Sequence, residues 1–278
     1  MKKLLIAIDA EKPDQQSIAF GCYLARLTRS GLTGVFLENL PAEQRPGVKF
    51  AHGGVYVETI DPTDLPETEF KLKACSENIT EFKAICEEQG ITCRVHRDKG
   101  VPAEELIAES RYADVIISGP RIFASSPLEM PAGLVKDLLV KSECPVIIAP
   151  RRAGPIDKIL FSYDGNASSV FAIKQFTNLF PELRDTEITV IQADENAVFD
   201  EEQKEKTYEY LREHYRWINF KNLHGKPEDE LFDFTLREAN ACLVMGAFGR
   251  NWLSRLFKAS TAEMVIKINN LPVFIAHQ

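Results

Sequence analysis

The residues whose types and spacing could do chemistry lie in the stretch VMGAFGRNWLSRLFKASTAE, near the end of the chain. An apolar run there ends in Gly246, and Gly249 follows shortly after. Ser260 and Glu263 have the S-x-x-E spacing of a capping box, which predicts a helix that begins near Thr261. Glycines let a ligand approach the backbone, and a helix N-terminus favours negative charge. The stretch therefore indicates an anion site, or else a capped strand-to-helix connection that binds nothing.

A second candidate follows an earlier apolar run. The residues 158–163 are strand-like and lead directly into Asp164 and Gly165. In open parallel sheets, ligands bind beyond the carboxyl ends of the strands, at the point where the strand order reverses. If the first and fourth strands of this unit are neighbours, Asp164 and Gly246 flank one crevice. A carboxylate there could meet a ribose hydroxyl or hold a metal through water. The alternative is a turn residue or a helix cap.

Strand and helix patterns alternate along the whole chain, which predicts an α/β fold with parallel sheets. The predicted strands of the first half are residues 4–8, 32–37, 91–96, 115–118 and 145–149. Those of the second half are residues 158–163, 187–193, 217–222, 242–245 and 272–276. A segment rich in proline, glycine and acids, from Pro41 to Phe70, interrupts the first half and leaves room for a short strand at Val55–Thr59.

The two halves repeat one unit. The segment GVPAEEL in the first half matches GKPEDEL in the second, DVIISG matches ACLVMG, and CPVIIA matches LPVFIA. The spacing from Gly119 to Ala149 equals that from Gly246 to Ala276, and Asp9 occupies the place of Asp164. The segment PRRAGP between the units has the composition of a linker. We therefore expect two domains, residues 1–152 and 153–278.

The composition of the chain limits which ligands and which cellular compartment we expect for the protein. The chain has 278 residues, 45% hydrophobic content and a formal net charge of −8, which argues against general binding of nucleic acid or anionic membranes. Its six cysteines form no C-x-x-C pair and no metal-ligand spacing, which indicates reduced thiols in a cytoplasmic protein. The first apolar run reaches an acid after about six residues, so we interpret it as a strand and not as a signal peptide.

Several enzyme motifs are absent from the sequence. It contains no G-x-x-x-x-G-K-[ST] P-loop, no G-x-G-x-x-G after a first strand and no G-x-S-x-G elbow. These absences argue against P-loop phosphoryl transfer, dinucleotide chemistry and α/β-hydrolase chemistry respectively. We name no catalytic residue, and Asp164 is the only candidate base for slow hydrolysis of a bound nucleotide.

The chain resembles the universal stress protein family in a tandem form, over essentially its whole length. The stretch from Gly246 to Thr261 looks like the family's ATP-binding signature G-x2-G-x9-G-[ST]. The resemblance implies a Rossmann-like, doubly wound sheet of five parallel strands in the order 3-2-1-4-5 in each domain. It also implies that the two domains pair through their last strands as an intramolecular pseudo-dimer.

The resemblance also implies the site residues of the second domain. Asp164, with Gly165 beside it, would meet the nucleoside; Met245 would lie beside the base or ribose, and the backbone near Gln192 would face the adenine. The remaining residues would hold the phosphates: Gly246, Gly249, Ser260 and Thr261. The implied ligand is ATP or a related adenine nucleotide, with Mg or Mn as possible companions.

Two departures weaken the match. Ala259 stands where the family has its third glycine, so its Cβ could strain the backbone or crowd a phosphate. In the first domain only Asp9 and Gly119 remain, Pro120 removes an N–H from the loop, and Ile122 stands in the place of Gly249. Ala132, Gly133 and Lys136 stand where the second domain has Ala259, Ser260 and Glu263. The first domain is therefore expected to have lost ATP binding in this mode.

The sequence favours a cytoplasmic stress-response protein whose second domain binds ATP and responds to it. One alternative is an interaction module that binds no nucleotide, with an unknown protein partner. Another is a slow ATPase. A third is a sensor of a different small ligand that uses the segment from Pro41 to Phe70 as a lid. Association of two chains into a homodimer stays open.

Overall fold

A computed structural model describes residues 1–38, 45–51, 54–60, 66–98, 101–124, 133–195, 198–246 and 270–276. The strands and helices of the first half are β1 (Lys3–Asp9), α1 (Gln15–Leu27), β2 (Gly31–Leu37), β3 (Arg45–Ala51), β4 (Gly54–Ile60), α2 (Pro66–Glu88), β5 (Cys93–Asp98), α3 (Pro102–Ser110), β6 (Val115–Ser118), α4 (Gly133–Lys141) and β7 (Val146–Ile148). Those of the second half are β8 (Lys158–Ser162), α5 (Ala167–Leu179), the 3₁₀ turn η2 (Pro181–Leu183), β9 (Glu187–Asp194), α6 (Glu201–Arg212), β10 (Trp217–His224), α7 (Pro227–Leu236), β11 (Ala241–Gly246) and β12 (Val273–Ala276).

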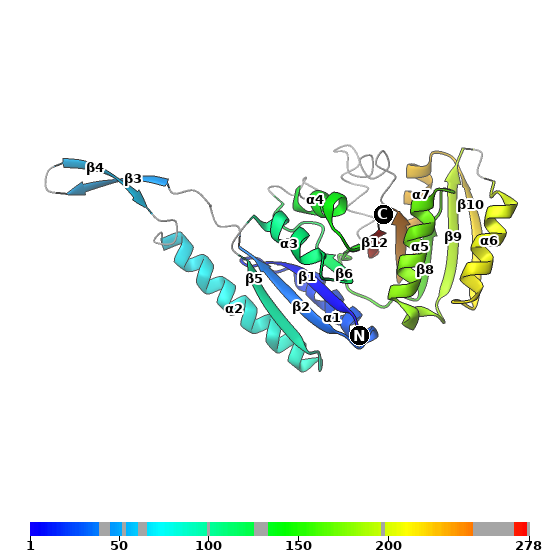
Figure 1. Cartoon of the computed structure of the whole chain (residues 1–278), viewed down its shortest axis with the longest axis horizontal. Helices are drawn as coiled ribbons and strands as arrows, with labels where there is room; N and C mark the ends of the chain where they lie inside the picture. The colour runs from blue at the N-terminus through cyan, green and yellow to red at the C-terminus, as the bar shows by residue number, and fades with distance from the viewer. Residues whose placement is uncertain are drawn as a thin grey trace.

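Ten strands form one sheet in the order β10-β9-β8-β11-β12-β7-β6-β1-β2-β5 (Figure 1). We call β8 to β12 the second half-sheet, and β1, β2, β5, β6 and β7 the first half-sheet. Each half-sheet is parallel and has the strand order 3-2-1-4-5, counted along its own chain segment. The predicted fold class is confirmed, including the reversal of strand order beside the first strand of each unit.

Alternating residues of the strands face two hydrophobic layers. In β1, Leu4 and Ile6 contact the layer formed with α1 and α2, whereas Leu5 and Ala7 contact the layer formed with α3 and α4. The second half-sheet continues both layers, with α5 and α6 on the first face and α7 on the second. Both faces of the sheet are therefore covered, as the near-continuous apolar strands require.

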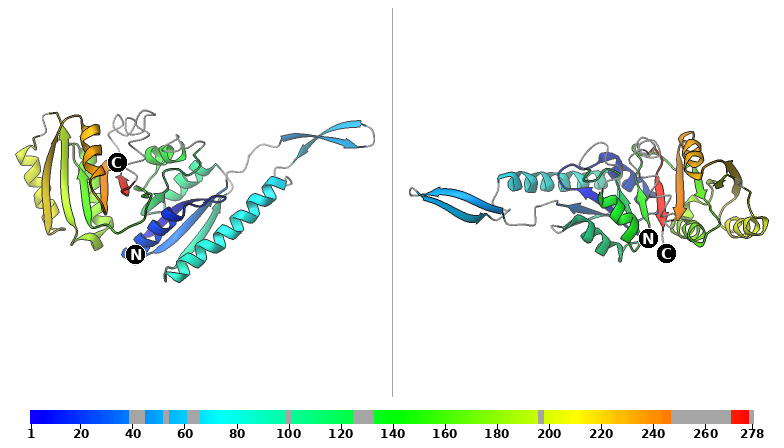
Figure 2. Two further views of the ribbon diagram at one scale, coloured as in Figure 1. Left: turned by 180° about the vertical axis from the view of Figure 1, so that it is seen from behind. Right: turned by 90° about the horizontal axis from the view of Figure 1, so that it is seen from above.

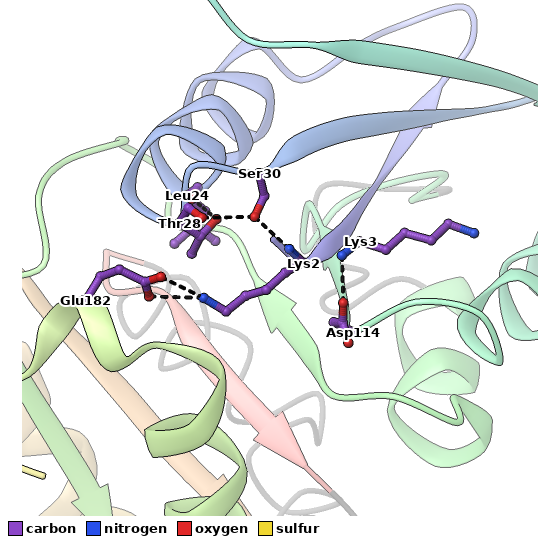
Figure 3. A network of polar contacts seen from close by, with 7 residues as sticks. All are labelled: Lys2, Lys3, Leu24, Thr28, Ser30, Asp114 and Glu182. Carbon is purple, nitrogen blue, oxygen red and sulfur yellow. Dashed lines mark hydrogen bonds and ion pairs between the residues drawn. The ribbon is translucent and has the colours of Figure 1, made fainter.

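The two half-sheets meet at β7 and β12, which are the antiparallel pair in the middle of the sheet. Ile147 lies opposite Phe274 there, and both side chains are buried. Away from the strands, Lys2 Nζ lies 2.9 and 3.1 Å from the two carboxylate oxygens of Glu182, and Lys2 N donates to Ser30 Oγ (Figure 3). The halves are thus joined both through the sheet and beside it.

The segment from Pro41 to Phe70 differs from the expectation of one short strand. It contains the antiparallel hairpin β3–β4, which forms a sheet of its own and extends away from the main sheet (Figures 1 and 2). Its second strand contains the predicted Val55–Thr59, whereas its first strand was not predicted. The helix α2 begins at Pro66, inside this segment, and Phe70 on it is exposed.

All six cysteines are free thiols, and all except Cys93 are buried. Within the described residues, no helix combines the length and apolar character that crossing a bilayer requires.

Candidate functional site

Asp164 lies just beyond the carboxyl end of β8, where the strand order of the second half-sheet reverses. Its Oδ1 accepts a hydrogen bond of 3.0 Å from the backbone N–H of Asn166, and its Oδ2 accepts one of 3.0 Å from Asn166 Nδ2. These bonds shape the turn into α5, and Gly165 adopts a φ of +77° within it. The side chain of Asp164 is exposed, so its oxygens still have lone pairs for a ligand.

Gln192 lies one strand away, near the end of β9. The register pairs Ser162 with Ile191, and the N–H of Tyr163 donates to Ile191 O over 2.8 Å. Gln192 therefore reaches the same edge of the sheet as Asp164. Its side-chain Oε1 is buried and has no hydrogen-bond partner among the described residues. A buried amide oxygen without a partner is costly, which makes this atom a candidate ligand contact.

Met245 and Gly246 end β11 on the other side of β8. Met245 is 3% exposed and packs in the hydrophobic layer beside α7, so core packing accounts for its type. A Cβ built on Gly246 would lie 2.5 Å from the carbonyl carbon and oxygen of Ser168. The glycine is thus required by the close approach of β11 to the first turn of α5, whether or not a ligand binds.

The structure brings together Asp164, Gly165, Gln192, Met245 and Gly246 at one edge of the second half-sheet. The predicted phosphate residues Gly249, Ser260 and Thr261 lie outside the described residues, as does Ala259. The described part of this edge can offer a carboxylate and an amide oxygen to hydrogen-bond donors of a ligand. No group of three or more His, Cys, Asp or Glu residues with metal-binding geometry occurs among the described residues.

The first half-sheet has an open cleft of about 620 Å³ at the corresponding edge, beyond β1 and β6. The retained Asp9 and Gly119 line this cleft together with Lys12, Arg121 and Arg151. Sequence reasoning did not single out the three basic residues. Arg151 lies in the segment interpreted as a linker. It follows the end of β7 by three residues, and this closeness to a strand end could have identified it as a residue near the binding edge of an open sheet.

Asp9 has a different environment from Asp164. Its Oδ1 accepts hydrogen bonds from the N–H groups of Glu11 and Lys12, at 2.9 and 3.0 Å. Burial raises the pKa of the Asp9 carboxyl above its ordinary value, and the two backbone N–H groups offset this only in part. Beside it, Ile122 is buried, so the position corresponding to Gly249 is filled by an apolar side chain.

The chain is similar to known proteins along its whole length. No family model matches the chain. The curated Universal stress protein Slr1230 of Synechocystis sp. is 23% identical to it, over 98% of this chain and 99% of that protein. The crystal structure of a universal stress protein from Archaeoglobus fulgidus covers 99% of this chain and is itself covered to 98%, with 15% identity and a TM-score of 0.66.

A further solved structure, of a shorter universal stress protein from Archaeoglobus fulgidus in complex with dAMP, covers 54% of this chain and is itself covered to 98%. It is 18% identical with a TM-score of 0.36, so its nucleotide is a property of that protein alone. The Synechocystis protein and the first Archaeoglobus structure, by contrast, match this chain over its full length. The resemblance to the universal stress protein family is thereby confirmed along the whole chain, in sequence and in fold.

Proposed function

We propose that this chain binds ATP or a related adenine nucleotide at the carboxyl ends of β8, β9 and β11. It would act as a nucleotide-responsive module of a stress response, and any hydrolysis of the nucleotide would be slow. The proposal assigns the site to the second of the two expected domains, residues 153–278. The free state of all six cysteines supports a cytoplasmic location.

The observation that carries this proposal is the pair of acceptors at the sheet edge. The exposed carboxylate of Asp164 and the Oε1 of Gln192, which has no hydrogen-bond partner in the described part of the chain, lie at adjacent strand ends, where open α/β sheets bind their ligands. A nucleoside offers ribose hydroxyls and an exocyclic amine, which are the donors that these acceptors need. The phosphates would then extend toward Gly249, Ser260 and Thr261, with or without a divalent cation.

The experiment is calorimetric titration of ATP into the full chain, together with analysis of a denatured extract for bound nucleotide. The parent should bind about one ATP per chain. Asp164→Asn should weaken binding about tenfold, because one hydrogen bond to an ionised group is lost. Gly249→Val should remove binding, because a valine side chain would block close approach of the phosphates.

Asp9→Asn is the matched control, since Asp9 occupies the corresponding place in the first half-sheet. It should leave ATP affinity unchanged. If Asp9→Asn weakens binding and Asp164→Asn does not, the nucleotide lies in the first half. If the parent binds no ATP at millimolar concentration, the alternative of an interaction module without nucleotide becomes the leading one.

A second candidate rests on the cleft of about 620 Å³ in the first half-sheet. Lys12, Arg121 and Arg151 offer three positive charges there, and the acids Asp9, Glu11 and Asp14 line the same cleft. Ile122 fills the place of a phosphate-loop glycine. With charges of both signs on its walls, this cleft would suit a small zwitterion and not ATP. Calorimetry with small zwitterions on the parent and on Arg121→Gln tests it, and equal heats from both proteins would contradict it.

A further inference from the structure

A second cleft, of about 340 Å³, opens at the opposite end of the second half-sheet. It lies between the turn η2 and the connection from α6 to β10, near the amino ends of β9 and β10. Its charged lining comes from three arginines and one acid, and its other polar lining residues are neutral: Arg184, Arg212, Arg216 and Glu213, with His214, Thr177 and Tyr215. The chain as a whole carries a net charge of −8, counted with neutral histidines, so this concentration of arginines is local.

Ordered elements position the three arginines. Arg184 ends η2, Arg212 lies in the last turn of α6, and Arg216 directly precedes β10. Between the last two, Tyr215 is buried, and its hydroxyl donates to Thr177 Oγ1 of α5 over 3.2 Å. The backbone N–H of Tyr215 also bonds Leu211 O at 2.8 Å. The turn that carries Arg212 and Arg216 is therefore fixed to the body of the domain.

The acids nearby neutralise part of this positive charge. Among the described residues, the carboxylates of Asp185 and Glu213 pair with the three guanidinium groups, which leaves an excess of one positive charge. Arg216 Nε lies 3.2 Å from Asp185, but the contacts of Arg184 Nε with Asp185 and of Arg212 Nε with Glu213 are 3.9 and 3.8 Å. Those two contacts exceed hydrogen-bond length, and each guanidinium has five N–H donors. The arginine side chains are 58–67% exposed, so a solute can reach them.

We propose that this cleft binds a small phosphate-bearing anion, with Arg184, Arg212 and Arg216 as its contacts. A phosphate group presents several oxygens in a tetrahedral arrangement, which three guanidinium groups from separate elements can contact together. A single carboxylate presents two oxygens in one plane and would use fewer of these donors. This site is independent of the proposed nucleotide site, because it lies at the other end of the parallel strands.

The probes are inorganic phosphate and pyrophosphate, titrated calorimetrically into the full chain at low ionic strength. We expect saturable binding that weakens as salt rises, since exposed charges are screened. Arg216→Gln and Arg184→Gln should each weaken binding about tenfold, the order expected for losing a charge-assisted hydrogen bond. Arg216→Lys should fall between, because lysine keeps the charge but loses the fork of donors. Malonate should bind more weakly than pyrophosphate.

Arg237→Gln is the matched control, because Arg237 is an exposed arginine at the end of α7 in the same half of the chain. It removes the same charge and should leave binding unchanged. Equal weakening by Arg237→Gln would mean that only overall charge matters and would overturn the proposal. So would pyrophosphate binding that Asp164→Asn or Gly249→Val abolishes and Arg216→Gln leaves intact, because the anion would then occupy the nucleotide site.

Discussion

At the scale of single residues, Gly246 shows how a motif glycine can be required by packing. A Cβ at this position would meet the backbone of α5 at Ser168 and Ser169, at 2.5 and 2.9 Å. Helix backbone cannot rotate away as a side chain can. We therefore expect Gly246→Ala to lower the free energy of unfolding by about 2–3 kcal/mol, as overpacked cores do. Urea denaturation measures this loss.

Gly119→Ala provides the control, since Gly119 directly follows β6, the corresponding strand of the first half-sheet. Its added Cβ would meet the side-chain Oγ of Ser17 at 2.9 Å, which a rotamer change can move. The loss should be clearly smaller than for Gly246→Ala. Equal losses for the two variants would mean that the backbone of α5 yields as easily as a serine side chain.

The half-buried carboxyl of Asp9 makes stability depend on pH. Because burial raises its pKa, the folded chain binds the proton more readily than the unfolded chain over the interval between the two pKa values. The ionised carboxyl therefore destabilises the fold at neutral pH, and this penalty is lost as pH falls through the raised pKa. Asp9→Asn should be more stable than the parent at pH 7, with a difference that shrinks toward pH 4.

Urea denaturation of both proteins at several pH values measures that difference. Because desolvation is its main cause, the difference should persist in high salt, which screens charge pairs but not burial. A difference that vanishes in salt would point instead to repulsion from the neighbouring Glu11. A constant difference from pH 7 to pH 4 would contradict a raised pKa.

The sequence could predict which residues reach the edge of the sheet where we propose that the nucleotide binds, but not how their side chains are packed there. Asp164 and Gly246 follow apolar runs, and strand ends in a parallel sheet share one edge, so their proximity was predictable. That Gln192 Oε1 has no hydrogen-bond partner among the residues that the structure describes depends on how neighbouring side chains pack, which no spacing encodes. The cluster of Arg184, Arg212 and Arg216 likewise depends on the fold, which brings Arg184 to the connection that carries Arg212 and Arg216.

At the scale of elements, the β3–β4 hairpin stands apart from the sheet that holds the fold together. Replacing residues 45–60 by a glycine-serine linker should change the free energy of unfolding by no more than about 0.5 kcal/mol, as for surface changes. The matched control lies in the next helix, where the ring of Phe82 packs edge-on against Phe36 at 5.7 Å between centroids.

Phe82→Ala should lower the free energy of unfolding by about 3–5 kcal/mol, because it empties a buried site. Thermal and urea denaturation followed by circular dichroism compare the two changes. If the linker variant loses as much stability as Phe82→Ala, the hairpin stabilises the main sheet, and the prediction that it folds apart from that sheet is wrong.

Element type was predictable where the apolar period was clear. Helices such as α1 and α5 show helical spacing, and the strands of the main sheet read as short apolar runs, because both faces of the sheet are covered. The first strand of the hairpin, Arg45–Ala51, has a proline, a glycine and two cations among its seven residues. Those residues weaken any strand pattern, which is why the hairpin was not predicted in full.

At the scale of the whole molecule, the pairing of β7 with β12 joins the two half-sheets into one sheet. The sequence predicted a repeated unit, and the resemblance implied pairing through the last strands. The antiparallel register of Ile147 and Phe274 gives that pairing its geometry. The Lys2–Glu182 ion pair and the bond from Ile156 N to Tyr23 OH, at 3.0 Å, add contacts between the halves (Figure 3 shows the former). Such contacts link residues too distant for any local pattern to reveal.

These connections predict that both halves unfold together. Both tryptophans, Trp217 and Trp252, lie in the second half, whereas circular dichroism reports both halves. In the parent, the fluorescence and dichroism transitions in urea should coincide, as one cooperative unit requires.

Ile147→Asp places an uncompensated carboxylate in the buried seam opposite Phe274 and should separate the two transitions. Val140→Asp makes the same chemical change at a site 73% exposed, and its transitions should still coincide. If the two transitions of Ile147→Asp still coincide, contacts outside the β7–β12 seam are enough to couple the halves. The double variant Ile147→Asp/Lys2→Met then tests the ion pair with Glu182. Separate transitions in this double variant would mean that the ion pair couples the halves.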